Sequence, residues 1–491
     1  MGQHMDYVVG IDVGTTGTKS ALFSGDGELV DIEYTSYPIA YPEEGWAEQD
    51  PQHWWEALSK TTRTVVERTG KGSAIRSLSL STQGGCLVLL DRNFSPARPA
   101  VSWMDRRASA VSGQLVQRIS VSELYHICGW PVLDSLNFPT MFWFRQKAPR
   151  LLQNVQYYAS TIDYLNYLLT GRLAIDYTNL ALTGFLDLKG KNYAEKTMHI
   201  AGITAENLPE IVPSGKVIGN LCAGAAEKLG LSEKVLVVSG AHDRYCESMG
   251  AGAIHPGDCV LGAGTSWVLL ATSDGLLFHK PRSTDRGFVR SMFPGPHPVE
   301  GKYGLMTVVP YGGNSLRWFR DVMRPASSFE QLNDDAAQMD IGAEGLMFIP
   351  ISSSTSGKGS FQGIDSIHNI NHFTRAVFEG VAFVNRIHFD LFRQAGLRVD
   401  KLIMIGGGTK STIWPHIVAD VCNVPVELPR IQEAACAGAA VLAASGCGLF
   451  SSIEEGSATF KGESSRIFPS EKRAEHYAER FESFLRFLDR V

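Results

Sequence analysis

Long apolar runs are missing from this sequence of 491 residues. Its most apolar window, residues 434–450, is rich in Ala and Gly and falls short of the roughly 20 residues needed to cross a bilayer. A buried helix is therefore predicted there. The N-terminus also lacks a charged segment followed by a long apolar stretch, so no secretion signal is expected.

Paired cysteine motifs and an excess of positive charge are missing as well. The eight cysteines show neither a C-x-x-C pair nor a zinc-like spacing, which predicts reduced thiols in a cytoplasmic protein. The net charge of -6 provides no excess positive field for a polyphosphate backbone. Neither nucleic acid nor a membrane is therefore expected as a main partner.

The length and composition predict a globular protein of two domains. A chain of 491 residues is too long for one ordinary hydrophobic core. Apolar residues make up 44% and charged residues 20%, which is typical of globular proteins and excludes a disordered or collagen-like chain.

An internal repeat supports two related domains. Residues 7–11 and 20–23 form two apolar β-like runs around a Gly/Thr-rich turn, and an Asp-Gly turn follows. The same layout returns about 250 residues later, with a Gly-Thr-Ser turn at 264–266 and an Asp-Gly turn at 274–275. We expect a first domain over residues 6–252 and a second over residues 253–491.

Helices are predicted between strands, which gives an α/β fold. Asp50 followed by Pro51 predicts the start of a helix that runs to Arg68, and its tryptophans are expected to pack in the core. Strand-like residues 235–238 and 402–405 each precede a glycine-containing loop and a helix. Ligand sites are expected at the ends of such strands.

The Gly/Thr-rich turns are candidate phosphate sites. Backbone N–H groups and threonine hydroxyls, here from Thr15 and Thr16, can bind phosphate oxygens, and Asp12 can hold Mg²⁺. One such turn alone is more often only a turn, but its duplication favours a role in nucleotide binding. The Gly406-Gly407-Gly408 loop lacks the Walker lysine, so it is not a P-loop.

Asp243 is the candidate general base, because a carboxylate at a strand end can accept the proton of an attacking hydroxyl. The alternative is a helix N-cap, and His242 is a rival base or a supporting residue. Trp103-Met104-Asp105 combines an aromatic face with polar groups that suit a polyol. The alternative there is a surface ion-pair cluster beside a core tryptophan.

Taken together, these segments resemble the FGGY family of carbohydrate kinases over nearly the whole chain. The resemblance is carried by the following segments: Gly10-Ile11-Asp12-Val13-Gly14-Thr15-Thr16, Gly45-Trp46-Ala47-Glu48-Gln49-Asp50-Pro51, Asp163-Tyr164-Leu165, Leu169-Thr170-Gly171, Gly264-Thr265-Ser266, Arg375-Ala376-Val377-Phe378-Glu379-Gly380 and Gly406-Gly407-Gly408. It implies two actin/Hsp70-like (ribonuclease H-like) domains with a ligand cleft between them, and transfer of the γ-phosphate of ATP to a sugar hydroxyl with Mg²⁺.

The resemblance also implies roles for individual residues. Asp243 is then the catalytic base and a substrate ligand, and Asp12 assists the metal. The sugar pocket is expected to include Gln83, Trp103, Met104 and Asp105. The nucleotide site is expected to include Asp12, Thr15, Thr16, Lys19, Gly264, Thr265, Ser266, Gly312, Gly313, Gly407, Gly408 and Ser411.

The chain is most similar to the xylulokinase branch, which implies a ketopentose such as xylulose as the substrate. Xylulokinases carry Gln-Met-His-Gly where this chain has Gln83-Gly84-Gly85-Cys86, so L-xylulose, erythritol, glycerol and gluconate stay open. An ATP-driven binding module of the actin/Hsp70 type and a catalytically silent sugar sensor are the alternatives from other classes. The oligomeric state is open, with a homodimer among the options.

Overall fold

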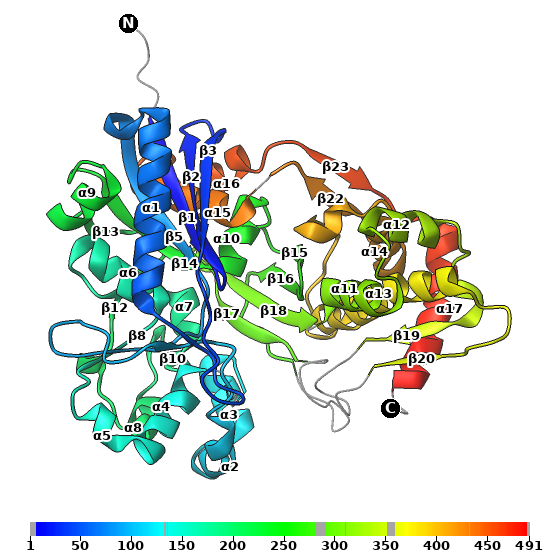
Figure 1. Ribbon diagram of the computed structural model, residues 1–491, viewed down its shortest axis with the longest axis horizontal. Coiled ribbons are helices and arrows are strands. Elements are labelled where there is room, and N and C mark those ends of the chain that lie inside the picture. The colour runs from blue at the N-terminus through cyan, green and yellow to red at the C-terminus, as the bar shows by residue number, and fades with distance from the viewer. Residues whose placement is uncertain are drawn as a thin grey trace, which may run out of the picture. The chain divides into compact units, whose positions relative to one another are not determined.

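The protein forms two compact units in a computed structural model (Figure 1). The structure describes residues 6–131, 134, 136–279, 291–309, 311–350, 359–431 and 433–488. Unit 1 comprises Met1–Ile254, Gly295–Lys302 and Ile431–Gly462, and unit 2 comprises His255–Pro294, Tyr303–Arg430 and Glu463–Val491. These units differ from the two continuous segments expected from the sequence, because two later stretches of the chain return to unit 1.

Unit 1 is built on a six-stranded sheet. The strands follow the order β13-β14-β5-β1-β2-β3. Strands β1, β2 and β3 are antiparallel neighbours, whereas β1, β5 and β14 run parallel. Asp12 lies opposite Lys19 across the β1–β2 hairpin, as the hairpin prediction requires. The bounds are β1 Tyr7–Val13, β2 Gly17–Ser24, β3 Leu29–Ser36, β5 Ile75–Thr82, β13 Val217–Asn220 and β14 Leu236–His242.

The second sheet repeats this pattern. Its order is β17-β18-β16-β15-β21-β22-β23. Strands β15, β16 and β18 are antiparallel neighbours, and β15, β21 and β22 run parallel, so these five strands match β1, β2, β3, β5 and β14 of the first sheet. The predicted duplication is confirmed. The bounds are β15 Asp258–Ala263, β16 Trp267–Ser273, β17 Phe293–Pro296, β18 Tyr303–Val309, β21 Lys401–Ile405, β22 Val426–Pro429 and β23 Ser464–Ile467.

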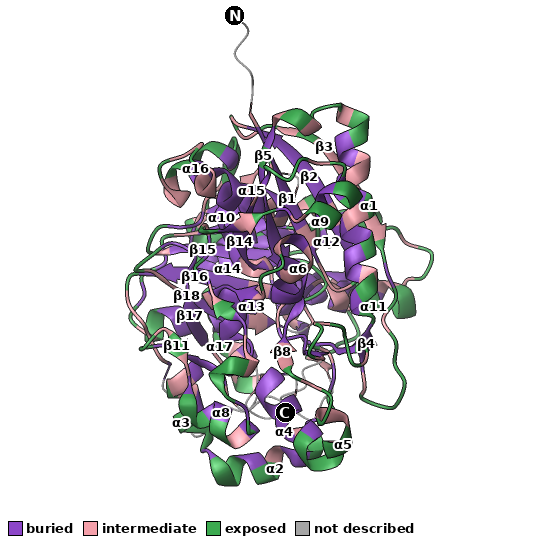
Figure 2. Cartoon of the chain, turned by 90° about the vertical axis from the view of Figure 1, so that its left-hand side faces the viewer, coloured by how far each residue is buried: buried purple, intermediate pink, exposed green. Residues whose placement is uncertain are grey.

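Helix α15, Ala434–Gly446, explains why residues 431–462 belong to unit 1. It is almost wholly buried, as the apolar window predicted, and it packs against β1, β5 and helix α10, Asp243–Gly250 (Figure 2). A Cβ atom at Gly10 of β1 would lie 1.9 Å from the carbonyl oxygen of Cys436. Glycine is therefore required there for close packing of helix and strand.

Helix α1, Pro51–Thr69, forms where the sequence predicts it. The side chain of Asp50 accepts a hydrogen bond from the N–H of Gln52 and caps the helix, with proline at the first turn. Trp54 and Leu58 are fully buried, which confirms a packing role for this tryptophan.

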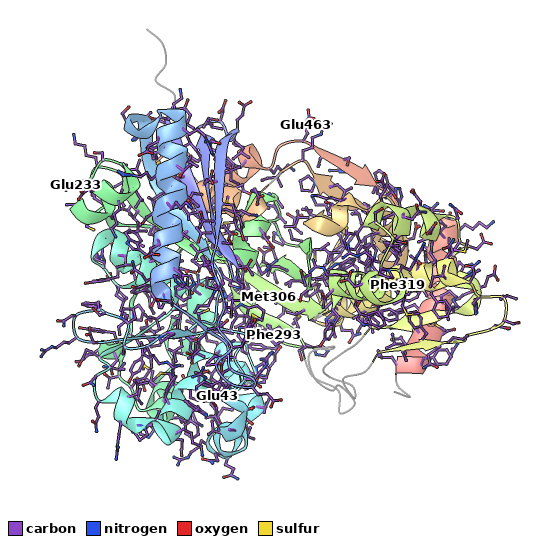
Figure 3. All side chains as sticks on the ribbon, in the orientation of Figure 1. Glu43, Glu233, Phe293, Met306, Phe319 and Glu463 are labelled. Carbon is purple, nitrogen blue, oxygen red and sulfur yellow. The ribbon has the colours of Figure 1, made fainter. Side chains whose placement is uncertain are left out.

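The core of unit 2 surrounds the long helix α13, Ile370–Gln394. Phe319, labelled in Figure 3, is fully buried in this core and lies on helix α11, Gly312–Met323. Helix α14, Trp414–Cys422, follows β21 and its glycine loop, as predicted. None of the helices in the described ranges is long and apolar enough to cross a membrane.

Candidate active site

Two carboxylates meet at the ends of the parallel strands of unit 1. Asp12, near the end of β1, accepts a hydrogen bond of 2.7 Å from the Ser81 hydroxyl on the neighbouring strand β5. Asp243 directly follows β14 as the first residue of α10. The backbone N–H of His242 donates to the Thr178 hydroxyl at 2.8 Å, which fixes the chain just before Asp243. The strand ends therefore hold both side chains on one edge of the sheet.

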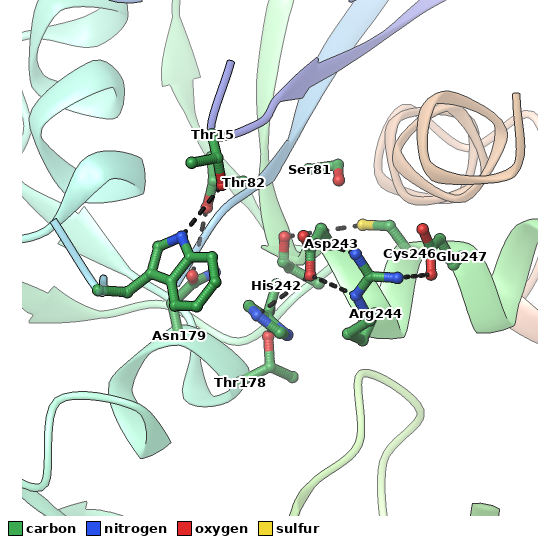
Figure 4. Close-up of polar contacts among 12 residues, drawn as sticks. Thr15, Ser81, Thr82, Thr178, Asn179, His242, Asp243, Arg244, Cys246 and Glu247 are labelled. Carbon is green, nitrogen blue, oxygen red and sulfur yellow. Dashed lines mark hydrogen bonds and ion pairs between the residues drawn. The ribbon is translucent and has the colours of Figure 1, made fainter. Parts of the chain in front are cut away.

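Asp243 carries its negative charge at neutral pH. Burial raises the pKa of this carboxyl, but the nearby Arg244 guanidinium, His242 and hydrogen bonds from Arg244 together outweigh that effect, and the pKa falls below its ordinary value. Its Oδ1 lies 3.3 Å from Nε of Arg244 and 3.1 Å from Nε2 of His242 (Figure 4). An ionised carboxylate at this position can accept a proton, so the catalytic alternative is chemically sound. The N-cap alternative does not describe the structure, because His242 occupies that position.

A further carboxylate completes a charged cluster around Arg244. Nη1 of Arg244 lies 2.6 Å from Oε2 of Glu247, one helical turn along α10 (Figure 4). Burial and the charge of Asp243 raise the pKa of Asp12 to about 6. Burial, only partly offset by Arg244, raises that of Glu247 to about 7. A raised carboxyl pKa here signals a site in which extra positive charge would be stabilising.

This donor set fits Mg²⁺ in the way that nucleotide sites use it. Within the described residues, no group of three or more His, Cys, Asp or Glu side chains is arranged to hold a metal by itself. Mg²⁺ commonly needs only one or two carboxylates, because nucleotide phosphates and water complete its shell. Asp12 supplies such a hard oxygen ligand, and the charge of Asp243 adds to the attraction.

The first Gly/Thr turn is anchored through its own carbonyls and hydroxyls. The Thr15 carbonyl accepts from Nε2 of Gln49 at 2.8 Å, and the Thr15 hydroxyl accepts from the Trp103 indole at 3.0 Å. The Thr16 carbonyl accepts from the Tyr37 N–H at 3.1 Å. These bonds hold the turn that carries Thr15 and Thr16 against the rest of unit 1.

Lys19 lies beside the same turn but is already paired. Its Nζ is 2.6 Å from Oε2 of Glu433, just before α15. Burial lowers the pKa of Lys19, but the hydrogen bond to Glu433 and the charges of Glu433 and Asp12 together outweigh that effect, so the pKa is raised. A role of Lys19 in nucleotide binding stays a prediction, and it would require this ion pair to open or to be shared.

The residues expected in the sugar pocket have different surroundings. Gln83 is buried and donates to the Gln49 side chain at 3.0 Å, while its Oε1 has no partner among the described residues. Trp103 is 42% exposed, so its indole face is free to stack, and Met104 is half-buried. The prediction that these residues bind sugar is compatible with this placement.

Asp105 forms the ion pair that the alternative interpretation expected, although it is buried instead of exposed. Its carboxylate accepts from the Ala47 N–H at 2.7 Å and from Nε and Nη2 of Arg107 at 2.8 Å each. The Arg107 guanidinium in turn stacks 3.8 Å from the Trp46 ring centroid. Asp105 therefore supports the chain beneath Trp103, and direct contact with sugar stays a prediction.

In unit 2, the glycine loops expected to bind nucleotide gather around the end of β15. The N–H of Gly313 donates to the Gly264 carbonyl at 3.1 Å, and the N–H of Asn314 donates to the Thr265 carbonyl at 2.9 Å. A Cβ atom at Gly408 would lie 2.7 Å from Cβ of Ala263. The turn that contains Ser266, the start of α11 at Gly312 and the loop at Gly407 are thus built as one packed cluster.

The Ser411 hydroxyl, expected in the nucleotide site, forms hydrogen bonds within unit 2. It accepts from the N–H of Trp414 at 3.0 Å at the start of α14, and it donates to Oδ1 of Asn333.

Arg244, Glu247 and Ser81 were not singled out from the sequence. The i, i+3 spacing of Arg244 and Glu247 was a visible signal, whereas the contact of Ser81 with Asp12 depends on strand pairing.

Comparison with known proteins identifies the family. The N-terminal domain of the FGGY family of carbohydrate kinases matches residues 7–250, and its C-terminal domain matches residues 261–447. A xylulose kinase of Bacillus subtilis (strain 168) is 30% identical over 488 residues, with 98% of this chain and 96% of that protein covered. A gluconokinase of the same strain is 26% identical, with 96% and 93% covered.

Solved structures agree with this assignment. A gluconate kinase and a ligand-bound xylulose kinase, both from Lactobacillus acidophilus, are each 25% identical and superpose with TM-scores of 0.91 and 0.90. In each case 98% of this chain and 97% of the other chain are covered. The expected fold class and the expected enzyme class, an ATP-dependent sugar kinase, are confirmed. The chain belongs to the FGGY family of carbohydrate kinases.

Proposed function

We propose that this kinase phosphorylates a hydroxyl group of a ketopentose, with xylulose as the first candidate. The observation that carries this proposal is the ionised carboxylate of Asp243, held at a strand end beside Asp12. Relatives named xylulose kinase from several bacteria, at 26–30% identity, support the choice of sugar. Gluconate is the second candidate, since a gluconokinase and a gluconate kinase are also similar to this chain.

The charges of the site favour a neutral sugar over a sugar acid. Arg244 is the cation next to Asp243, but its guanidinium is engaged by both Asp243 and Glu247. Asp12 adds a third carboxyl group to this cluster. A substrate carboxylate would therefore meet repulsion from Asp243 and would have to compete for Arg244.

The chemical step follows from these residues. The sugar hydroxyl oxygen attacks the γ-phosphorus of ATP, a new O–P bond forms, and the bond to the β,γ-bridging oxygen breaks to release ADP. Asp243 accepts the proton of the attacking hydroxyl and Arg244 keeps its carboxylate in place. Mg²⁺, held by Asp12 and the phosphates, would neutralise charge during transfer.

The remaining sites are assigned as follows. Gln83, Trp103, Met104 and Asp105 bind the sugar, and Arg107 holds the carboxylate of Asp105 in place. The first turn, with Thr15, Thr16 and Lys19, and the glycine cluster of unit 2 bind the nucleotide. That cluster consists of Gly264, Thr265, Ser266, Gly312, Gly313, Gly407 and Gly408, with Ser411 at its border.

We further propose a cytoplasmic enzyme without nucleic-acid partners. All eight cysteines lie in the described ranges and are free thiols, as expected for a reducing compartment. A homodimer is the assembly to test, and light scattering of the purified protein decides between it and a monomer.

ATP consumption coupled to ADP release tests the function. The panel is D-xylulose, L-xylulose, D-ribulose, erythritol, glycerol and gluconate, each with Mg²⁺ and with excess chelator. We expect the highest kcat/KM for a ketopentose and no turnover in chelator. A highest kcat/KM for gluconate would overturn the ketopentose proposal, and no sugar-dependent turnover with any compound would overturn the kinase function itself.

A further inference from the structure

A row of three rings lies beside Asp243 within unit 1. His242 and Tyr245 are 6.3 Å apart between ring centroids, and Tyr245 and His297 are 5.7 Å apart. His297 comes from residues 295–302, which belong to unit 1, and its neighbour Gly295 lies so close that a Cβ there would be 2.9 Å from the Tyr245 hydroxyl. The row therefore connects the candidate base to a returning segment of the chain.

The proton position on His297 is determined by its contacts. Nδ1 of His297 accepts the N–H of Val299 at 3.0 Å, and burial lowers the pKa of His297 to about 3. His297 is therefore neutral, and its proton is on Nε2, a donor without a partner among the described residues. The ring is 6% exposed.

His242 also has a buried ring nitrogen without a partner among the described residues. Burial lowers its pKa, so the ring is neutral, and its Nε2 faces the Asp243 carboxylate at 3.1 Å. Its Nδ1 is again without a partner in the described ranges, and in a neutral ring each nitrogen either donates or accepts. His242 is 8% exposed.

Unmet donors and acceptors of this kind are uncommon in a folded protein. Most buried polar atoms have a partner, and each buried atom without one is costly unless a ligand or water completes it. A hydroxyl group can donate to one ring nitrogen or accept from another, whereas a methyl group can do neither and a carboxylate cannot donate.

Resting on the function proposed above, we propose that the row of His242, Tyr245 and His297 binds hydroxyl groups of the sugar and selects against deoxy sugars. The row lies next to the base, so a sugar whose attacking hydroxyl reaches Asp243 brings its neighbouring hydroxyls toward these rings. Sites that hydrogen-bond a substrate hydroxyl discriminate strongly against the analogue that lacks it, because the protein group is then left unpaired.

The test compares the best sugar of the panel with each of its single-deoxy analogues, in the wild type and in His297→Phe. For at least one deoxy position, the wild type should prefer the intact sugar in kcat/KM, and His297→Phe should reduce this preference at least about tenfold. His297→Gln, which keeps an N–H donor, should restore part of it. Circular dichroism and thermal unfolding confirm that each variant is folded.

His388→Phe is the matched control. His388 lies on α13 in unit 2, is fully buried, and has two ring nitrogens without partners among the described residues, but it has no catalytic carboxylate among its recorded contacts. Its substitution should leave the preference between intact and deoxy sugars unchanged. An unchanged preference in His297→Phe, while sugar phosphorylation continues, overturns the inference and leaves the kinase function standing. Loss of preference in His388→Phe would overturn it as well.

Discussion

The two central hairpins of this protein have the same place in their sheets but different chemistry. In unit 1, Asp12 lies opposite Lys19 at the end of the β1–β2 hairpin. In unit 2, the matching pair across β15 and β16 is Gly262 and Val268. One hairpin thus carries charge at this pair of positions, and the other carries none.

The surroundings of each hairpin extend this difference. The first is flanked by Asp243, Arg244 and Glu433, which hold charges at short distances. The second is flanked by Gly313 and Gly408, whose missing side chains let the backbones touch. In the function proposed above, unit 1 supplies the base and the metal ligand, whereas unit 2 supplies closely packed backbone for the nucleotide. Each prediction below alters one side of this division.

Asp243→Asn should have the largest effect. The amide cannot accept the proton of the attacking hydroxyl, so we expect kcat to fall roughly 10²- to 10⁴-fold with little change in ATP binding. Steady-state kinetics with the best sugar, together with calorimetric titration of an ATP analogue, measure the two quantities. A kcat near that of the wild type would show that Asp243 is not the general base.

Asp12→Asn should make the protein more stable at neutral pH while impairing catalysis. The pKa of Asp12 is raised to about 6 by burial and by Asp243, so ionisation destabilises the folded state. The contribution of protonated Asp12 to the free energy of unfolding is fully present below about pH 4 and is lost as the pH rises through about 6. We expect the variant to gain about 1–3 kcal/mol at pH 8 and nothing near pH 4.

Urea unfolding in the presence of chelator measures this difference, since bound Mg²⁺ would lower the pKa of Asp12. A constant gain at every pH would show that packing, and not charge, distinguishes Asp12 from Asn. A loss of stability at pH 8 would contradict the raised pKa altogether.

Gly313→Ala tests the backbone side of the comparison. The added Cβ would lie 2.4 Å from the Gly264 carbonyl oxygen, so the turn or the start of α11 must shift. We expect a loss of about 1–3 kcal/mol in unfolding free energy and a higher KM for ATP. Gly275→Ala is the control, because it lies outside the proposed nucleotide cluster and a Cβ there meets nothing within 4 Å. Equal effects in both variants would mean that packing against the hairpin is not the cause.

Local patterns predicted the parts of the molecule that depend on neighbouring residues. The apolar runs around the two turns, the Asp50-Pro51 helix start and the strand before Gly406 are all found as expected. The candidate base at Asp243 follows from the same logic, since a strand end precedes a helix. These features are set by periodicity and by residues a few positions apart.

Long-range packing set the parts that sequence patterns missed. Helix α15 was predicted as a buried helix, but its place in unit 1 depends on the close approach of Gly10 to Cys436. The pair of Asp105 and Arg107 becomes evident only when the fold buries both side chains. The return of His297 to Tyr245 likewise joins residues that no local pattern connects.

Glu433→Gln should have the smallest effect and sharpens the role of charge at the first hairpin. The pair of Glu433 and Lys19 is short, at 2.6 Å, but the two side chains are 31% and 35% exposed. An ion pair with this exposure is weakened by solvent and by salt, so we expect a loss of only about 0.2–1 kcal/mol, shrinking further in high salt. The pair raises the pKa of Lys19, so its contribution is present throughout the neutral range and is lost only in strong alkali, where Lys19 loses its proton.

Unfolding of Glu433→Gln, Lys19→Met and the double variant isolates the coupling between the two side chains. If the coupling is this small while the KM for ATP falls in Glu433→Gln, the pair holds Lys19 away from the nucleotide, and the charge of the first hairpin serves binding more than stability. A coupling of several kcal/mol would instead show that the pair mainly stabilises the fold. The charge of the first hairpin would then serve stability more than nucleotide binding.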